Sequence, residues 1–442
     1  MAPMLWRLAM FAVLATACGS QEPALSHDEL LDPAACKDCH ERHYTEWIGS
    51  SHAYAADDPV FAAMNARFLR DTGGDPATCV RCHAPVALAE GATTDGSNLA
   101  TVDPALKGVT CFACHVVATA NPASHEFELA TDDVLLGPID NPVGTGAHHS
   151  AYSTLVDRDV WRSTDLCGTC HDFQNTNGVH VHRTYTEWTD SMFSDSFNQL
   201  FLSCGGCHMD SDPAKIATGN VPVRRHHNHT LPGMNVALQP WPEANTQRDA
   251  INEDLAPVVF ARLCLSGGVL QPIVTLDNVM GGHAFPSGDT STRRAWVELT
   301  VYSGTRVIYQ SGVVDDDTPL LSKTDPDLWL LGDKLIDDSG AYALFPWQAA
   351  TLDATGLQPA VTNDPADPRY YHSVTREYPA LTEVPDRMTL RVRVRPIGLD
   401  VIDELIAGGD LDTAVRARIP TFTLEGTMIE WTGERGDCVP AL

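Results

Sequence analysis

The sequence predicts an α+β protein of more than one domain, with a helix-and-loop N-terminal part followed by an antiparallel β-sandwich. Two observations predict this division. Up to residue 237 the chain carries five Cys-x-x-Cys-His motifs and few long apolar runs, which favours short helices and loops. Beyond residue 290 polar and apolar residues alternate, as in half-buried strands. The expected boundaries are 28–237, a linker at 238–290, and 291–442.

The first residues have the features of an export signal. Arg7 precedes an apolar run from Leu8, and Ala15-Thr16-Ala17 matches an A-x-A cleavage site. The run is too short to span a bilayer. Residues 1–17 are therefore predicted to be a signal peptide, and the mature protein is expected in the periplasm or at the cell surface.

Cys18, directly after that site, resembles the lipid-modified cysteine of bacterial lipoproteins, although Ala15 stands where a leucine is preferred. We expect a lipid anchor here and no other membrane contact. Ordinary signal peptidase cleavage is the alternative.

The five motifs are typical of covalent haem attachment. Two cysteine thiols add to the haem vinyl groups, and the histidine that follows binds the iron from the proximal side. Zinc sites need four converging ligands, and thioredoxin-like Cys-x-x-Cys pairs do not use the histidine. The predicted cofactors are five covalently attached haem c groups. The attachment cysteines are Cys36, Cys39, Cys79, Cys82, Cys111, Cys114, Cys167, Cys170, Cys204 and Cys207, and the proximal ligands are His40, His83, His115, His171 and His208.

The N-terminal part holds too little aliphatic side chain for a core of its own, so the macrocycles are expected to form the core. A helix at 59–70 fits this expectation, with Phe61, Met64 and Phe68 at helical spacing. Tyr-Thr-Glu-Trp occurs at 44–47 and again at 185–188, which indicates repeated haem-binding units. Five residues beyond each tryptophan the copies differ, with His52 in the first and Phe193 in the second.

The C-terminal part is predicted to contain strands at 295–302, 306–313, 388–394 and 422–431, with a helix from 399 that continues to 416. This pattern suggests an immunoglobulin-like sandwich. Cys264 and Cys438 bracket this part and can form a disulfide in an oxidising compartment, and two buried free thiols are the alternative.

The formal net charge is −29, from 29 basic and 58 acidic residues. This charge makes nucleic acid an implausible partner. It would steer a basic redox protein toward the surface, although acidity also serves solubility.

Eighteen histidines less five proximal ones leave thirteen, enough for a second ligand on every iron. Two histidines give a low-potential electron-transfer haem, methionine raises the potential, and an open position binds substrate.

The chain resembles multihaem cytochromes related to hydroxylamine oxidoreductase and its tetrahaem electron acceptor. The resemblance is carried by Glu46-Trp47, Ser51-His52-Ala53, Gly108-Val109-Thr110, 166–172, 229–233, Gly282-His283-Ala284-Phe285-Pro286 and 293–298. It implies that His52, His229 and His283 are distal ligands. His148 or His149 is the next candidate, and His125, His180 or His182 could complete the set. No motif ends in lysine, as the catalytic one of pentahaem nitrite reductases does, and no segment clearly supplies the crosslinked tyrosine of hydroxylamine oxidoreductase.

The favoured function is electron relay through bis-histidine haems between redox protein partners, without substrate turnover. The alternative is an oxidoreductase acting on a small nitrogen or sulfur compound at one five-coordinate haem, for which Phe193 is the sequence indication. Assembly into an oligomer or conductive filament is a third hypothesis. The sequence leaves open the partners, the potentials, the membrane face and the fifth distal ligand.

Overall fold

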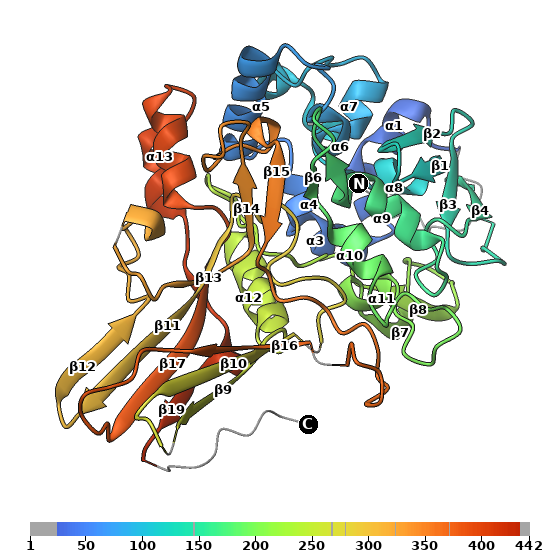
Figure 1. Ribbon diagram of the computed structural model, residues 1–442. Helices are drawn as coiled ribbons and strands as arrows, with labels where there is room; N and C mark the ends of the chain where they lie inside the picture. Colours follow the sequence, from blue (N-terminus) through green and yellow to red (C-terminus); the bar gives the residue numbers. More distant parts are fainter. Residues whose placement is uncertain are drawn as a thin grey trace, which may run out of the picture.

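The computed structural model describes residues 24–433, apart from positions 145, 267, 279, 323 and 371. Helices and small ladders form the N-terminal part, and two larger sheets form most of the C-terminal part (Figure 1). The predicted signal peptide, Cys18 and Cys438 lie outside the described residues.

Short helices make up much of the N-terminal part, as expected, but its four two-stranded ladders were not predicted. The helices are α1 His27–Leu31, α2 Pro33–Lys37, α3 Glu41–Ile48, α4 Ser51–Tyr54, α5 Pro59–Thr72, α6 Val80–His83, α7 Pro85–Ala89, α8 Cys111–His115, α9 Ser163–His171, α10 Thr184–Thr189 and α11 Cys204–His208. The antiparallel ladders join β1 Val117–Asn121 to β2 Glu126–Leu129, β5 Phe173–Gln174 to β6 His180–His182, and β7 Ser211–Lys215 to β8 Val223–His227, while β3 Val134–Gly137 and β4 His149–Tyr152 are parallel.

The predicted helix at 59–70 is confirmed as α5. Asp58 accepts a hydrogen bond from the Val60 N–H at its start, with Pro59 in the first turn, where a missing N–H costs little. Gly73, at φ +58°, ends the helix.

The C-terminal part begins with α12 Ala244–Leu255. Its three-stranded sheet contains β9 Phe260–Leu265, β10 Pro272–Asp277 and β16 Ser373–Glu377. Its six-stranded sheet contains β11 Arg294–Ser303, β12 Arg306–Ser311, β13 Trp329–Leu331, β17 Arg387–Arg395, β18 Phe422–Thr423 and β19 Ile429–Trp431, and a separate hairpin joins β14 Asp333–Ile336 to β15 Thr351–Ala354. The remaining α-helix is α13 Leu399–Ala407.

Three predicted strands are confirmed as β11, β12 and β17. The predicted strand at 422–431 is interrupted by a 3-10 turn at Glu425–Thr427, so β18 and β19 pair separately with β17. The helix predicted to continue to 416 ends at Ala407, and a 3-10 segment follows at Thr413–Arg418. The 238–290 segment is more than a linker, because it contains α12, β9 and β10. The immunoglobulin-like topology stays a prediction.

One hydrophobic core joins the two parts. Val60 and Ala63 of α5 belong to the same buried cluster as Ile402 and Leu405 of α13 and the inner residues of both sheets. In Figure 1, α13 lies beside α5 at the upper left. Because burial of this apolar surface stabilises both parts together, neither is an independent folding unit in this structure.

Ion pairs at the edge of this core reinforce the contact. The carboxylate of Asp410, after α13, accepts two hydrogen bonds from Arg70 of α5, at 2.6 and 2.8 Å, and its side chain is only 6% exposed. Hydrogen bonds from Arg70 hold the pKa of Asp410 below its usual range.

Replacing Asp410 tests this contact. We expect Asp410→Asn to lower the free energy of unfolding by about 1 kcal/mol at pH 7, a figure discounted for the exposure of Arg70. Because the folded pKa is depressed, this contribution is present above the unfolded pKa of about 3.9 and disappears as pH falls below it. Denaturant unfolding at pH 7 and pH 3 measures the difference, with exposed Asp338→Asn as control. Equal stability of wild type and Asp410→Asn at pH 7 would contradict the prediction.

Candidate haem-binding site

The attachment motifs lie in or beside single turns of helix. In a helix, residues at i, i+3 and i+4 share one face, so one turn presents both thiols and the histidine together. Side-chain caps hold two of these turns. Thr110 accepts from the Ala113 N–H at the start of α8, and Ser203 accepts from the Gly206 N–H at the start of α11.

Thiols of different motifs meet in space. The hydrogen-bonded pairs are Cys36 with Cys111, Cys82 with Cys170, and Cys167 with Cys204. Cys114 also lies near Cys167. The first motif therefore adjoins the third, and the fourth motif adjoins the second, third and fifth.

Two cysteines take part in disulfides in the structure, Cys39 and Cys264. In the haem-loaded protein, the Cys39 thiol is required for a thioether bond. The proposed partner of Cys264, Cys438, lies outside the described residues.

Four proximal histidines each face a distant histidine. A metal–imidazole bond is about 2 Å long, so two imidazoles on opposite sides of one iron place their ring centroids about 6 Å apart. The observed centroid separations are 6.2 Å for His40 and His148, 6.5 Å for His115 and His229, 6.1 Å for His171 and His52, and 6.2 Å for His208 and His283. These separations fit one iron between each pair.

Hydrogen bonds orient most of these rings. Nδ1 lies 2.7 Å from the Ile216 carbonyl oxygen in His40, 2.6 Å from that of Leu136 in His115, and 3.1 Å from that of Pro232 in His208. Among the distal candidates, Nδ1 of His229 lies 2.7 Å from the His227 oxygen and Nδ1 of His283 lies 3.0 Å from the Ala284 oxygen. A donated Nδ1–H leaves Nε2 as the nitrogen for a metal.

Burial keeps several of these imidazoles neutral. Desolvation lowers the pKa of His52 to about 4, and the pKa values of His171 and His229 to about 3. Neutral imidazole is the form that binds iron, so no proton has to be displaced at neutral pH.

The fifth proximal histidine, His83, differs from the other four. Its ring stacks on Phe61 at 4.0 Å, and among the described residues no histidine ring contacts it. Burial lowers the pKa of His83 to about 4, with a further contribution from the charge of nearby His182, one of the candidates for its distal ligand. All three candidates also have other contacts. Nε2 of His180 lies 2.8 Å from Asp172, His182 faces Asp289 at 3.7 Å, and His125 packs against Phe173.

The remaining histidine choices are also distinguished by position. The structure brings half-buried His148 toward His40, while His149 is exposed. His43 also lies 5.8 Å from His40, but it belongs to the next turn of the same chain segment and packs between His226 and His229. The His43 ring is therefore a neighbour of these sites and does not face His40 from the opposite side.

A buried network beside His229 was not foreseen. Glu46 accepts a hydrogen bond from the His229 backbone N–H at 3.0 Å and lies 3.0 Å from Nε2 of fully buried His226. Arg42 binds the other Glu46 oxygen at 2.9 Å and also binds Asp212. The repeated Tyr-Thr-Glu-Trp motif was the sequence signal that could have identified Glu46.

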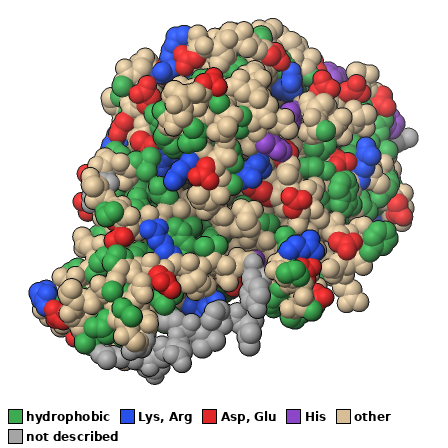
Figure 2. Space-filling model, in the orientation of Figure 1, with side chains coloured by type: hydrophobic (Ala, Val, Ile, Leu, Met, Phe, Trp, Pro, Cys, Tyr) green, Lys and Arg blue, Asp and Glu red, His purple; other side chains and the backbone are tan. Residues whose placement is uncertain are grey.

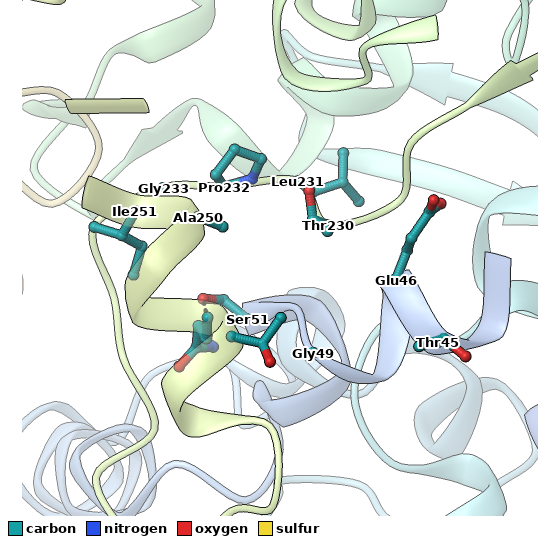
Figure 3. Close-up of a pocket in the computed structure, with 12 residues that line it drawn as sticks. Thr45, Glu46, Gly49, Ser51, Thr230, Leu231, Pro232, Gly233, Ala250 and Ile251 are labelled. Carbon is teal, nitrogen blue, oxygen red and sulfur yellow. Dashed lines mark hydrogen bonds between the residues drawn. The ribbon is translucent and has the colours of Figure 1, made fainter. Parts of the chain in front are cut away.

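A cavity of about 130 Å³ lies beside this network (Figure 3). It separates α3 from α12 and from the 230–233 segment, and Glu46 and Pro232 both line it. The Pro232 oxygen faces Nδ1 of His208, and Glu46 binds the backbone of His229, which faces His115. Residues that hold the His115 and His208 sites therefore line the same cavity.

Acidic and basic side chains are interspersed on the face shown in Figure 2. The excess of acidic residues therefore forms no continuous negatively charged patch on this face. Within the described part of the chain, no helix is both long and apolar enough to cross a membrane.

Comparisons with known proteins support the class of protein that the five motifs indicate. Residues 35–116 match the family model described as cytochrome c554 and c-prime. The fold is similar to a penta-haem cytochrome c552 from Thermochromatium tepidum, with a TM-score of 0.63 and 20% sequence identity over 91% of this chain and 99% of that chain. No curated protein matches significantly. With the five motifs, these findings support a multihaem c-type cytochrome that binds haem covalently.

The motif count predicts the haem load. We expect the mature protein to carry five haems by intact-protein mass spectrometry, because every motif supplies both thiols and the proximal imidazole. A variant with Cys204→Ala and Cys207→Ala should carry four. A wild-type mass with fewer than five haems would contradict the count.

Proposed function

We propose that this protein is an exported electron-transfer cytochrome that relays electrons between redox proteins through bis-histidine haems. Haems are numbered here in the order of their attachment motifs. The proposed ligand pairs are His40 with His148 for haem 1, His115 with His229 for haem 3, His171 with His52 for haem 4, and His208 with His283 for haem 5.

The observation that carries this proposal is the set of four imidazole pairs at 6.1–6.5 Å. Each pair joins a proximal histidine to one from a distant part of the chain, so the fold itself must assemble it. An iron with two strong imidazole ligands offers no position to a substrate, and each haem supplies a site for one electron.

The chain also holds the attachment motifs in a connected order. Thiol contacts join motif 1 to motif 3 and motif 4 to motif 5, and Cys114 lies near Cys167 of motif 4. This order supports a route along sites 1, 3, 4 and 5, with site 2 as a branch from site 4 through Cys82 and Cys170. Burial of the ligands excludes water and favours their neutral form.

The predicted signal peptide and Cys18 support a place outside the cytoplasmic membrane. Covalent haem attachment in bacteria takes place there as well. We propose a periplasmic or cell-surface location with a lipid on Cys18. An acyl-modified mature N-terminus in the mass spectrum would support the anchor.

Electron paramagnetic resonance of the oxidised protein tests the relay. We expect low-spin signals from at least four irons, because four imidazole pairs are in place. His283→Ala should convert one low-spin iron to high spin, since it removes one axial ligand. Exposed His149→Ala, with no change in the count, is the control. A wild-type protein with fewer than four low-spin irons would contradict the proposed function.

A second candidate function is favoured by the ring contacts of His83. Its contact with Phe61, and with no histidine ring among the described residues, is compatible with an open position at haem 2. Such an iron could bind a small nitrogen or sulfur compound, with the other haems carrying electrons. Phe193 does not mark this iron, because it packs near Gly282, beside His283.

Ligand titration distinguishes the two functions. If haem 2 is open, cyanide, nitrite or hydroxylamine should shift the spectrum of one iron, and Cys79→Ala with Cys82→Ala should abolish that shift. Absence of any shift in the wild-type protein would leave electron relay as the function and rule out the oxidoreductase.

A further inference from the structure

The two Tyr-Thr-Glu-Trp segments have equivalent places in the structure. Trp47 donates from Nε1 to the carbonyl oxygen of Val109 at 2.8 Å, and Trp188 donates to that of Leu202 at 2.9 Å. Val109 stands two residues before Cys111, and Leu202 two residues before Cys204. Each tryptophan therefore anchors the segment that leads into an attachment motif.

The equivalence extends beyond the tryptophans. The carbonyl oxygen of His52 accepts from the Val109 N–H at 2.9 Å, and that of Phe193 accepts from the Leu202 N–H at 3.0 Å. The first cysteines of the adjoining motifs also meet, Cys36 with Cys111 and Cys167 with Cys204. The chain thus contains two copies of a two-haem unit, and the segment at 53–108, which carries motif 2, is an insertion in the first copy.

The glutamates of the two copies face distal histidines. Glu46 accepts from the backbone N–H of His229 at 3.0 Å. Glu187 accepts from the N–H of Ala284, the residue after His283, at 3.1 Å, and from the Ser287 hydroxyl at 2.7 Å. Both carboxylates are held by an arginine four residues earlier, Arg42 at 2.9 Å and Arg183 at 3.3 Å.

We propose that Glu46 and Glu187 are equivalent positioning residues that hold the distal histidines of haems 3 and 5 in place. This inference rests on the proposed ligand pairs. Within each unit, tryptophan fixes the proximal side of a haem site and glutamate fixes the distal side, so one helix determines the space between the two imidazoles. Glu187 is only 5% exposed, which keeps solvent from replacing its hydrogen bonds.

Individual hydrogen bonds hold the distal segments in place. His229 and His283 lie in irregular chain outside the helices and strands. Their Nδ1 partners, His227 and Ala284, belong to the same segments. The carboxylate of Glu46 or Glu187 therefore adds a contact from a different element. In the His283 segment it stands beside the hydrogen bonds of Thr184 to Ser287 and Gly288.

The experiment compares Glu46→Ala and Glu187→Ala with the wild type, all as full-length, haem-loaded proteins. We expect the electron paramagnetic resonance spectrum of each variant to show a smaller low-spin signal, by no more than the signal of one iron. We also expect cyanide to displace one distal imidazole at least tenfold faster. Glu41→Ala in α3 and Asp190→Ala after α10 are matched exposed controls, for which neither reading should change.

A general loss of structure is distinguished by two further readings. Haem content by mass and far-ultraviolet circular dichroism should match the wild type, because the thioethers and helices are retained. Glu46→Gln and Glu187→Gln keep an acceptor oxygen but lose the charge that Arg42 and Arg183 bind, so their cyanide rates should fall between wild type and the alanine variants.

Two results would overturn the inference, and they differ. A wild-type protein without four low-spin irons would refute the ligand pairs and the positioning role together. A wild-type protein with them, whose alanine variants keep the same spin count and cyanide rate, would refute the positioning role alone.

Discussion

In the proposed bis-histidine arrangement, the need for a second imidazole on the far side of an iron is the constraint on which the rest of this structure depends. A Cys-x-x-Cys-His motif supplies its thioethers and proximal ligand locally, within one turn of helix. The opposing imidazole cannot come from the same turn, so it has to be delivered from elsewhere. Here His52 faces His171, His229 faces His115, and His283 faces His208. Because each pair joins residues far apart in the sequence, the separate haem sites belong to one fold.

The same constraint accounts for the union of the two structural parts. His283 lies between β10 and β11, the strands that flank it in the C-terminal part, yet its ring faces the motif in α11. The hydrogen bonds of Glu187 and the core shared by α5 and α13 bring these regions together. In the proposed ligand arrangement, the C-terminal part therefore contributes to a haem site.

The different surroundings of His52 and Phe193 follow from the repeated unit. Both occupy the same place in the repeated unit, as their hydrogen bonds to Val109 and Leu202 demonstrate. In the first copy the side chain faces His171 of the second copy, whereas no later copy of the unit follows Phe193 in the described chain. The position in the second copy is buried near Gly282. A substitution that suggests an open iron in the sequence is thus explained by packing.

The sequence predicted the features that depend on local pattern. The attachment motifs, α5 and the long strands β11 and β17 could be identified because their signals lie in short segments. The iron faced by each distal histidine could not be identified, because it depends on contacts between distant residues such as His148 and His40. The same limit applies to β10, whose place in a sheet depends on pairing with β16, far along the chain.

A structure of the haem-loaded protein, with the axial ligands resolved at each iron, tests this account most directly. The account predicts His40 with His148, His115 with His229, His171 with His52, and His208 with His283 on opposite sides of four irons. A different residue, or none, opposite any of those four proximal histidines would contradict it.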